Sequence, residues 1–406
     1  MLLVLVVHIL LCNYSSSPRH DLDLEANIRA YQSLARIGPN HSFSRNRDAN
    51  KIVQAPIRLP RWFRPVDLTT LKLHVSGDGS PFNCTISKTS PAFRICVHSK
   101  EHDKYISAAL LSSGLWEPFA TRAYQQALTF HPDAAVVDIG ANIGYYTLLA
   151  AAMGHSVVAV EPQRENLKRL AEAAKDPYSG PSSSDDLSTT NSQSLSQGQR
   201  NAKRRNEEFN TKDGPSAGSI LLLANAVSDA HRNVSLTTSA DNQGGVRVVE
   251  NCGSAGWFLA SALGLTQWYR RGQKQDTGSD SQGDCSVTTI TLDDVLNVLP
   301  SPKVIIKVDI EGYECRALAT SHRFFSSVQV PYILMEWRQM RERQRDRGTH
   351  CTPAQVSGLA LFLARQGYVP HEMRSGMALD PHRATGWVLG DVYWRAAGQR
   401  LLVPSW

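Results

Sequence analysis

The chain has 406 residues, of which 42% are hydrophobic and 20% are charged. These fractions are close to the averages of globular proteins, so they exclude a collagen-like chain, a wholly disordered chain and a polytopic membrane protein. The formal net charge is only +6 and the sequence has no zinc-finger or RNA-recognition signature, so we expect no nucleic-acid partner.

The chain opens with an apolar run from Leu2 to Cys12, which as a helix would span about 16 Å, roughly half of a bilayer core. We interpret residues 1–12 as a secretory signal peptide, with a truncated membrane anchor or a buried terminal segment as alternatives. The polar, proline-punctuated text that follows predicts a stem over 13–60 and a small N-terminal cap region over 61–130.

The cysteines and glycosylation sequons bear on the cellular compartment. Seven cysteines are present: Cys12, Cys84, Cys96, Cys252, Cys285, Cys315 and Cys351. With Cys12 in the leader, six remain for three disulfides, and Cys84 with Cys96 is the first expected pair because strand-like segments flank a short separation. Four sequons lie at Asn13, Asn40, Asn83 and Asn233. Together these features favour the secretory pathway, either its ER or Golgi lumen or secretion, over a cytosolic chain with free thiols.

The main domain is predicted over 131–397, where apolar strands alternate with helical segments. Such alternation indicates βαβ units and therefore an α/β sheet with helices on both faces. Strands are expected at 71–75, 93–98, 134–139, 156–160, 220–224, 234–238, 246–249, 287–291, 304–308, 332–335, 368–372 and 392–394. Helices are expected at 107–115, 119–130, 142–153, 164–175, 292–299, 313–319 and 353–366. Two polar runs, a disordered one at 176–218 and another at 270–284, interrupt this pattern as insertions.

The most informative stretch is Asp138 to Thr147, where a buried strand ends and the chain turns through two glycines into a helix. Gly140 removes a side chain that would block a cofactor, and Gly144 allows the helix to pack closely. A dinucleotide site prefers a glycine where Asn142 stands. The carboxylate of Asp138 would repel a pyrophosphate but attract the sulfonium of S-adenosylmethionine (SAM), so the pattern favours SAM, with a ligand-free tight turn as the alternative.

At this point the sequence resembles the FkbM family of SAM-dependent methyltransferases. The similarity runs from about Phe93 to Arg395, and its most distinctive segment is Ile306 to Glu314. The other matching motifs are Asp138–Thr147, Val160–Pro162, Ala226–Asp229 and Thr291–Asp294. The resemblance implies a class I methyltransferase (Rossmann-like) fold, with a seven-stranded, mostly parallel sheet whose last strand is antiparallel. It also implies methylation of a hydroxyl, commonly on a sugar or another secondary alcohol.

Acidic residues follow several predicted strands, where ligands of such folds collect. We assign Asp138 and Gly140 to the methionine part of SAM, Glu161 to its ribose and Asn225 to Asp229 to its adenine edge, with a turn-capping role as the alternative for Asp229. Asn142 and Gly144 complete the cofactor-binding set. No cysteine pair has the spacing of a zinc site, so no metal is expected.

Methyl transfer mainly requires that the acceptor oxygen be aligned and its proton removed. Asp309 and Glu311 are the candidate catalytic residues, because an extended chain would point both to one side. A helix N-cap is the alternative for Asp309, and Lys307 is expected to pair with it and weaken it as a base. Glu336 is a candidate for substrate binding or strand capping. Trp116-Glu117 looks like a family element that folds over the cofactor, with simple packing of Trp116 as the alternative.

The sequence therefore predicts a SAM-dependent O-methyltransferase acting on a glycan or a small metabolite. A non-catalytic SAM-binding protein of the secretory pathway is the alternative, and a nicotinamide oxidoreductase lacks the glycine that it would need at position 142.

Overall fold

The computed structural model describes residues 61–66, 82–175, 218–239, 241–250, 286–342 and 351–402. The predicted leader, the stem and the strand at 71–75 lie outside these residues. So do both insertions, apart from residue 218.

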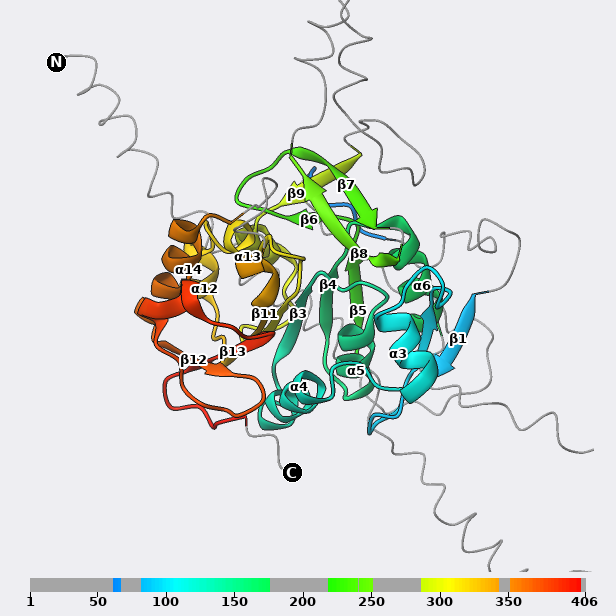
Figure 1. Cartoon of the computed structure of the whole chain (residues 1–406), viewed down its shortest axis with the longest axis horizontal. Coiled ribbons are helices and arrows are strands. Elements are labelled where there is room, and N and C mark those ends of the chain that lie inside the picture. Colours follow the sequence, from blue (N-terminus) through cyan, green and yellow to red (C-terminus); the bar gives the residue numbers. More distant parts are fainter. Residues whose placement is uncertain are drawn as a thin grey trace, which may run out of the picture.

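A seven-stranded sheet forms the centre of the molecule, as predicted (Figure 1). Its strands, in spatial order, are β12 (Tyr368–Glu372), β13 (Asp391–Ala396), β11 (Tyr332–Glu336), β10 (Val304–Val308), β3 (Ala135–Ile139), β4 (Val157–Val160) and β5 (Ile220–Leu223). The last strand, β13, runs antiparallel to both of its neighbours, whereas the pairs from β11 to β5 are parallel. Every residue of β3 and β10 is buried, as expected for strands covered on both faces.

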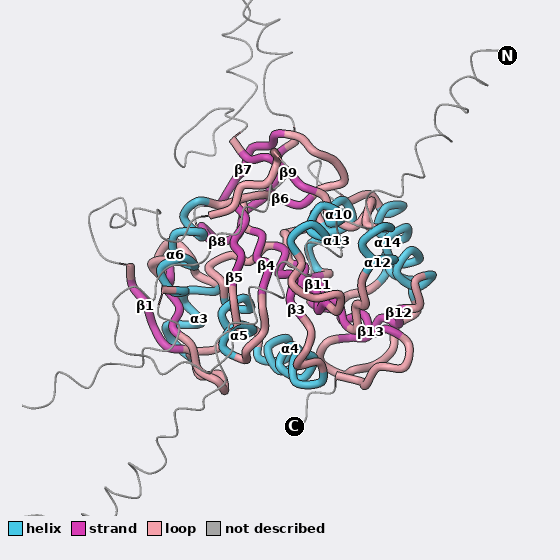
Figure 2. Tube along the Cα trace, turned by 180° about the vertical axis from the view of Figure 1, so that it is seen from behind, coloured by secondary structure: helices cyan, strands magenta, loops and turns pink. Residues whose placement is uncertain are grey.

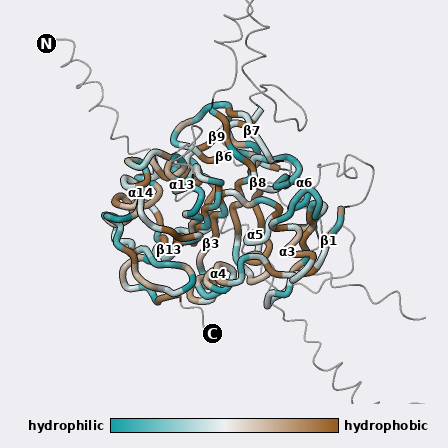
Figure 3. The backbone as a smooth tube through the Cα atoms, in the orientation of Figure 1, coloured by the Kyte–Doolittle hydropathy of each residue, from teal (hydrophilic) through white to brown (hydrophobic). Residues whose placement is uncertain are grey.

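Helices cover both faces of this sheet (Figures 1 and 2). One face packs against α4 (Pro118–Phe130), α5 (Tyr145–Ala152) and α6 (Arg164–Ala174). The other packs against α10 (Leu292–Val295), a 3-10 turn (Leu296–Val298), α11 (Glu314–Ala317), α12 (His322–Ser327), α13 (Arg338–Glu342), α14 (Pro353–Arg365) and a 3-10 helix (Pro381–Gly386). Hydrophobic colours follow the central strands in Figure 3, where the two cores meet the sheet. Among the described residues, no helix has both the length and the hydropathy needed to cross a bilayer.

The predicted N-terminal cap shares the core of the main domain. Its strands β1 (Asn83–Ile86) and β2 (Arg94–Val97) pair antiparallel and place Cys84 opposite Cys96, and these two residues form the expected disulfide. The cap also contains α3 (Ile106–Ser113). Apolar side chains of β2 and α4 belong to the same buried cluster as α5 and α6. The cap is thus built onto the helical layer of one sheet face.

The structure also contains a second, four-stranded sheet, which the sequence pattern did not distinguish from the first. Its order is β6 (Ala226–Val227), β9 (Val287–Ile290), β7 (Asn233–Ser239) and β8 (Asn242–Val249). Three of these strands were predicted, at 234–238, 246–249 and 287–291, but they were not assigned to a separate sheet. Residues 61–66 provide the reason, since the Val66 amide donates to Leu222 O and the Ala224 amide donates to Arg64 O along the edge of β5. That edge is occupied, so the later strands pair with one another.

Two helices have bounds that differ from the predicted ones. The helix predicted from residue 142 begins at Tyr145, because Asn142 and Gly144 have left-handed φ values of 52° and 94°. The helix predicted at 292–299 is α-helical only to Val295. The helices α12 and α13 were not predicted.

Candidate active site

A cavity of about 890 Å³ lies at the carboxyl ends of the central strands. The loops that follow β3, β4 and β10 contribute to its walls, together with β8, the end of β11 and the residues before α4. Seven predicted site residues line it: Gly140, Asn142, Glu161, Asn225, Asp309, Glu311 and Glu336. Asp138, Gly144 and Asp229 are not among its lining residues. The structure thus brings most of the predicted site together from distant parts of the sequence.

The two glycines of the turn are required by the protein's own packing. A Cβ atom on Gly140, whose φ is 84°, would lie 1.9 Å from the carbonyl oxygen of Asp309. Gly140 therefore lets the loops after β3 and β10 touch, rather than only clearing a path for a cofactor. A Cβ atom on Gly144 would lie 2.2 Å from Cδ1 of Leu170, so this glycine makes room for the Leu170 side chain of α6 at the start of α5.

Glu161 is a buried carboxylate that faces the cavity immediately after β4. Its Oε2 accepts a hydrogen bond of 2.8 Å from the Asn142 amide, and its Oε1 accepts one of 2.9 Å from the Gln163 amide. Burial raises the pKa of Glu161 to about 7, against the effect of these hydrogen bonds. The side-chain amide of Asn142 donates to Gly244 O at 2.9 Å, so the turn is also fixed to β8.

We predicted that Asp138 would contact the cofactor, but it is not among the residues that line the cavity. Its Oδ2 accepts a hydrogen bond of 2.6 Å from the Thr147 hydroxyl, and the carboxyl is 1% exposed beneath α5. Burial raises the pKa of Asp138 to about 6, while the Thr147 hydrogen bond and the neighbouring Lys307 oppose that shift. Asp138 therefore joins the strand to the helix that follows the turn, because the pleat of β3 directs its side chain to the face covered by α5.

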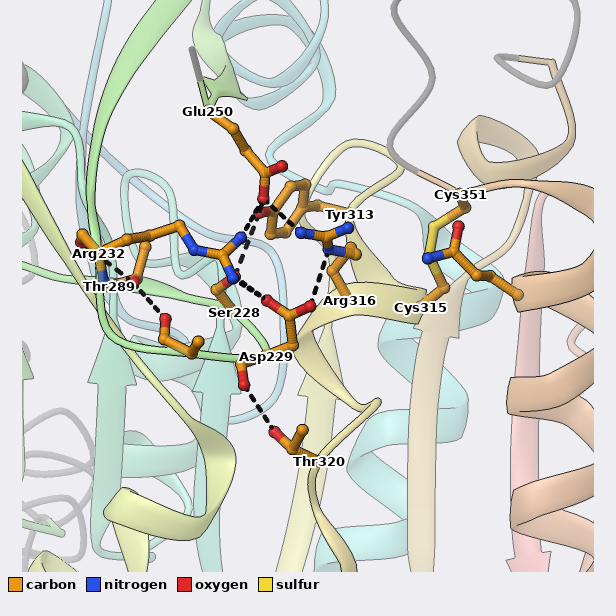
Figure 4. Close-up of polar contacts among 12 residues, drawn as sticks. Ser228, Asp229, Arg232, Glu250, Thr289, Tyr313, Cys315, Arg316, Thr320 and Cys351 are labelled. Carbon is orange, nitrogen blue, oxygen red and sulfur yellow. Dashed lines mark hydrogen bonds and ion pairs between the residues drawn. A yellow bond between two sulfur atoms is a disulfide. The ribbon is translucent and has the colours of Figure 1, made fainter. Parts of the chain in front are cut away.

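Asp229 lies in an ion-pair cluster instead of the predicted adenine site (Figure 4). It pairs with Arg232 at 2.7 Å and with Arg316 at 3.1 Å, and Glu250 pairs with the same two arginines. Tyr313 donates its hydroxyl to Glu250. The small sheet and α11 are thereby joined, so neither the adenine role nor the simple turn-capping alternative describes Asp229.

Asn225 borders the cavity, but its side chain is committed elsewhere. Its amide donates at 2.9 Å to Trp62 O and at 2.9 Å to Thr288 O, and its Oδ1 accepts from the Arg64 amide at 2.9 Å. Any contact of Asn225 with an adenine would therefore involve its backbone rather than its side-chain amide.

Asp309 and Lys307 form the predicted pair, with Nζ and Oδ2 2.8 Å apart. Burial alone would lower the pKa of Lys307, but Asp309, Glu117 and Asp391 together raise it above its usual range. The strand ends at Val308 and Glu311 has a left-handed φ of 59°, so the predicted extended path from Asp309 to Glu311 is wrong, although both residues line the cavity.

The helix-capping alternative for Asp309 is also wrong. The N-cap of α11 is Tyr313, and Glu314 organises the loop by accepting from the amides of Ile310 and Gly312 at 3.1 and 3.3 Å. Asp309 thus remains a cavity residue.

Further carboxyl groups meet Asp309 at the same end of the cavity. Glu117 and Asp391 both line it, and Glu117 accepts a 2.8 Å hydrogen bond from the Tyr146 hydroxyl. Trp116 also lines the cavity and packs against the core beneath it, so its position agrees with both interpretations. The sequence did not identify Asp391, because a lone aspartate before a terminal strand carries no spacing signal. Within the described residues, no group of three or more histidine, cysteine or acidic side chains is arranged to hold a metal ion.

Two solved structures are similar to this chain at low identity. The methyltransferase domain of bacterial CtHen1-CN is 10% identical with a TM-score of 0.26, over 68% of this chain and 97% of that chain. Magnesium protoporphyrin IX methyltransferase (ChlM) from Synechocystis PCC 6803, with bound S-adenosylhomocysteine (SAH), is 10% identical with a TM-score of 0.25, over 68% of this chain and 84% of that chain. No curated protein matches the chain.

The comparison with protein families is decisive. The methyltransferase FkbM domain matches residues 138–370, which is more than half of the 406 residues. The matched segment contains the glycine turn, Glu161, the loop after β10 and Glu336, whereas Glu117 and Asp391 lie outside it. The chain belongs to the FkbM methyltransferase family.

Proposed function

We propose that this protein binds SAM in the cavity and transfers its methyl group to a hydroxyl oxygen of a glycan or a small metabolite. One observation carries the proposal: the glycine turn after β3, Glu161 after β4 and Asp309 after β10 line the same cavity, although they are far apart in the sequence. Ligands of α/β folds bind at this edge of the sheet.

The chemistry of the lining residues fits SAM. Oε1 of Glu161 already accepts two hydrogen bonds, from Gln163 and Asn166. Oε2 has a second lone pair beyond the one used by the Asn142 amide, so it can accept from a ribose hydroxyl. The backbone of Gly140 and Asn142 would border the methionine part, and residues 225–227 would border the adenine. Carboxylates on the wall also suit a sulfonium, because opposite charges attract strongly where water is partly excluded.

Asp309 is our candidate for orienting the acceptor hydroxyl. When bound, SAM supplies an electrophilic methyl group on a positively charged sulfur that leaves as a neutral thioether. The acceptor oxygen would bond to the methyl carbon as the carbon–sulfur bond breaks, and Asp309 or water would take the hydroxyl proton. Lys307 holds one oxygen of Asp309 at 2.8 Å, which leaves the other oxygen to accept from the acceptor.

Sheet order supports separate places for the donor and the acceptor. The proposed cofactor residues follow β3 and β4, whereas Glu336 ends β11 on the other side of β10. Asp309 follows β10, between the two groups. An acceptor beside Glu336 would therefore meet the methyl group next to Asp309.

We also propose that the protein works in the lumen of the secretory pathway or after secretion, with residues 1–12 as a signal peptide or membrane anchor. Two disulfides, Cys84–Cys96 and Cys315–Cys351, support an oxidising compartment. The sequon residues Asn83 and Asn233 are both exposed. Peptide mapping of protein from secreting cells should find glycans on them, and unmodified sites together with free thiols would refute this compartment.

A tritiated methyl-transfer assay on a panel of glycans and small alcohols tests the activity. Asp309→Asn should lower kcat at least about tenfold while the Kd for SAM changes little, because only the acceptor would lose a partner. Glu161→Ala should instead raise the Kd for SAM by about ten- to hundredfold, as expected for one charged hydrogen-bonding partner. SAM binding without transfer to any acceptor would favour a non-catalytic binding protein, and equal effects of Asp309→Asn on kcat and Kd would remove its acceptor role.

A further inference from the structure

The sheet register places three ionisable side chains side by side at the end of the cavity. Lys307 lies opposite Leu334 in the β10–β11 ladder, so Glu336, two residues further on, points to the same face of the sheet. Glu336 lies opposite Asp391 in the β11–β13 ladder, so Asp391 shares that face too. Glu336 and Asp391 both line the cavity.

Glu117 reaches this group from above the sheet. It precedes α4 with a left-handed φ of 42°, a conformation that non-glycine residues adopt only when their surroundings hold them. Its Oε2 accepts from Tyr146 of α5, and the Lys307 ammonium lies 4.9 Å from the centre of the Tyr146 ring. The carboxyl of Glu117 is thus fixed close to Lys307 and Asp391 in this row.

Two of the cations that line the cavity are already engaged with other groups. Lys307 is already bound to Asp309, and the Arg374 guanidinium lies over the Phe119 ring at 5.2 Å. Within the part of the chain that the structure describes, Oε2 of Glu336 is buried and has no hydrogen-bond partner. Such a group is costly to leave unsatisfied, and it lies beside further acids.

The pKa values of all three acids are raised, because the carboxyl groups are buried close to other acids. Burial, and then Asp391, raises the pKa of Glu117 to about 8. Burial raises the pKa of Asp391 to about 6 even though Lys307 and Arg374 act in the opposite direction. Burial, followed by Asp309, raises the pKa of Glu336 well above its usual value. A bound hydroxyl would satisfy one oxygen and leave the repulsion between the carboxylates, whereas a cation would relieve both.

We infer that Glu117, Glu336 and Asp391 form an acceptor subsite that takes a positively charged group, an ammonium carried by the acceptor close to the hydroxyl that is methylated. This inference rests on the proposed function and narrows its acceptor to an amino alcohol, such as an amino sugar. Glu117 and Asp391 lie outside the family match at 138–370, whereas Glu336 lies inside it, so two of the three acids come from parts of the chain that the family domain does not include.

Three methyl glycosides of one ring shape test the charge preference: the neutral glucoside, the amino sugar with its amine protonated and the uronic acid. The wild-type protein should show the highest kcat/KM with the amino sugar, about tenfold above the neutral sugar, as expected for one additional charged hydrogen bond, and the lowest with the uronic acid. Glu117→Gln and Asp391→Asn should each raise KM for the amino sugar by about tenfold and leave KM for the neutral sugar within about threefold, with the Kd for SAM unchanged. Asp133→Asn is the matched control, since this exposed carboxylate pairs with Lys303 before β3, away from the cavity.

Binding is read separately from turnover, by saturation-transfer NMR of the three sugars with and without SAH. If SAH fails to bind but the amino sugar still binds preferentially and Asp391→Asn abolishes that preference, the proposed function fails and the subsite stands. If methyl transfer occurs but the three sugars react equally, or none of them binds, the inference is overturned. Stabilisation by Mg²⁺ alone that Asp391→Asn removes would also overturn it, because the acids would then form a metal site.

Discussion

Gly140 connects the cofactor turn with the loop that carries Asp309. Because its φ is 84° and an added Cβ would lie 1.9 Å from Asp309 O, Gly140→Ala must displace one of the two loops. We expect a loss of about 1–3 kcal/mol in the free energy of unfolding, measured by urea denaturation, together with a fall in kcat. Gly386→Ala is the control, since nothing lies within 4 Å of its Cβ position. Equal stability of the two variants would contradict the contact.

Glu117 should make stability depend on pH above neutrality. Its pKa is raised to about 8 by burial and by Asp391, so the folded state holds its proton more tightly than the unfolded chain does. The resulting stabilisation is present in full below the unfolded pKa and is lost as the pH rises through about 8. Between pH 7 and 9 the wild type should therefore lose about 1 kcal/mol more than Glu117→Gln does in chemical denaturation. Parallel profiles for the two proteins would show that Glu117 is not held in this way.

For single residues, the sequence allowed the chemical type of the site residues to be predicted better than their contacts. The acids at or just after the ends of β4, β10 and β11 were predicted to meet, and they do, because parallel strands end at one edge. The use of Asp138 was missed because the pleat of β3, not its spacing in the motif, decides that it faces Thr147. Glu117 was expected near the cofactor only through the family resemblance, and its place beside Asp391 was not predictable because it depends on how α4 packs over the sheet.

Among the elements, α11 is restrained at two neighbouring residues. The ion-pair cluster of Figure 4 joins Arg316 to the small sheet, and the neighbouring Cys315 is bonded to Cys351 just before α14. The cluster and the disulfide fix the segment that follows Asp309. The sequence predicted the element but neither restraint, because six cysteines permit fifteen pairings and ion pairs require known neighbours.

Removing each disulfide should lower the free energy of unfolding, and removing one of them should also lower activity. Cys315–Cys351 closes a separation of 36 residues and Cys84–Cys96 one of 12, so the chain-entropy model expects losses of about 4 and about 3 kcal/mol when each pair is replaced by serine. Urea denaturation of the two double variants measures these losses. Only the Cys315–Cys351 variant should also lower kcat, since only it releases the segment after Asp309. A larger fall in activity for the Cys84–Cys96 variant would contradict this assignment.

Strand positions were predicted well, but their grouping into sheets was not. The strands at 233–239, 242–249 and 287–290 were expected, yet they form a separate sheet because residues 61–66 occupy the edge of β5. A local pattern of apolar residues predicts that a segment is a strand but does not predict which strand it pairs with.

For the whole molecule, the fold class followed from the alternation of strands and helices and from the family resemblance. The seven-stranded order with an antiparallel last strand agrees with that expectation. The sequence did not predict which residues lie on each side of Asp309 in the cavity, because that depends on the order of the strands in space. In the structure, the glycine turn and Glu161 lie on one side of Asp309, and Glu336 and Asp391 lie on the other.

The most direct test of this account is a crystal structure of the protein with SAH. We predict that the ribose hydroxyls lie within hydrogen-bonding distance of Glu161 and that the sulfur lies between the Gly140 turn and Asp309, with its methyl-bearing side facing Glu336 and Asp391. Well-ordered SAH that leaves Glu161 without a contact, or that lies outside this cavity, would contradict the account.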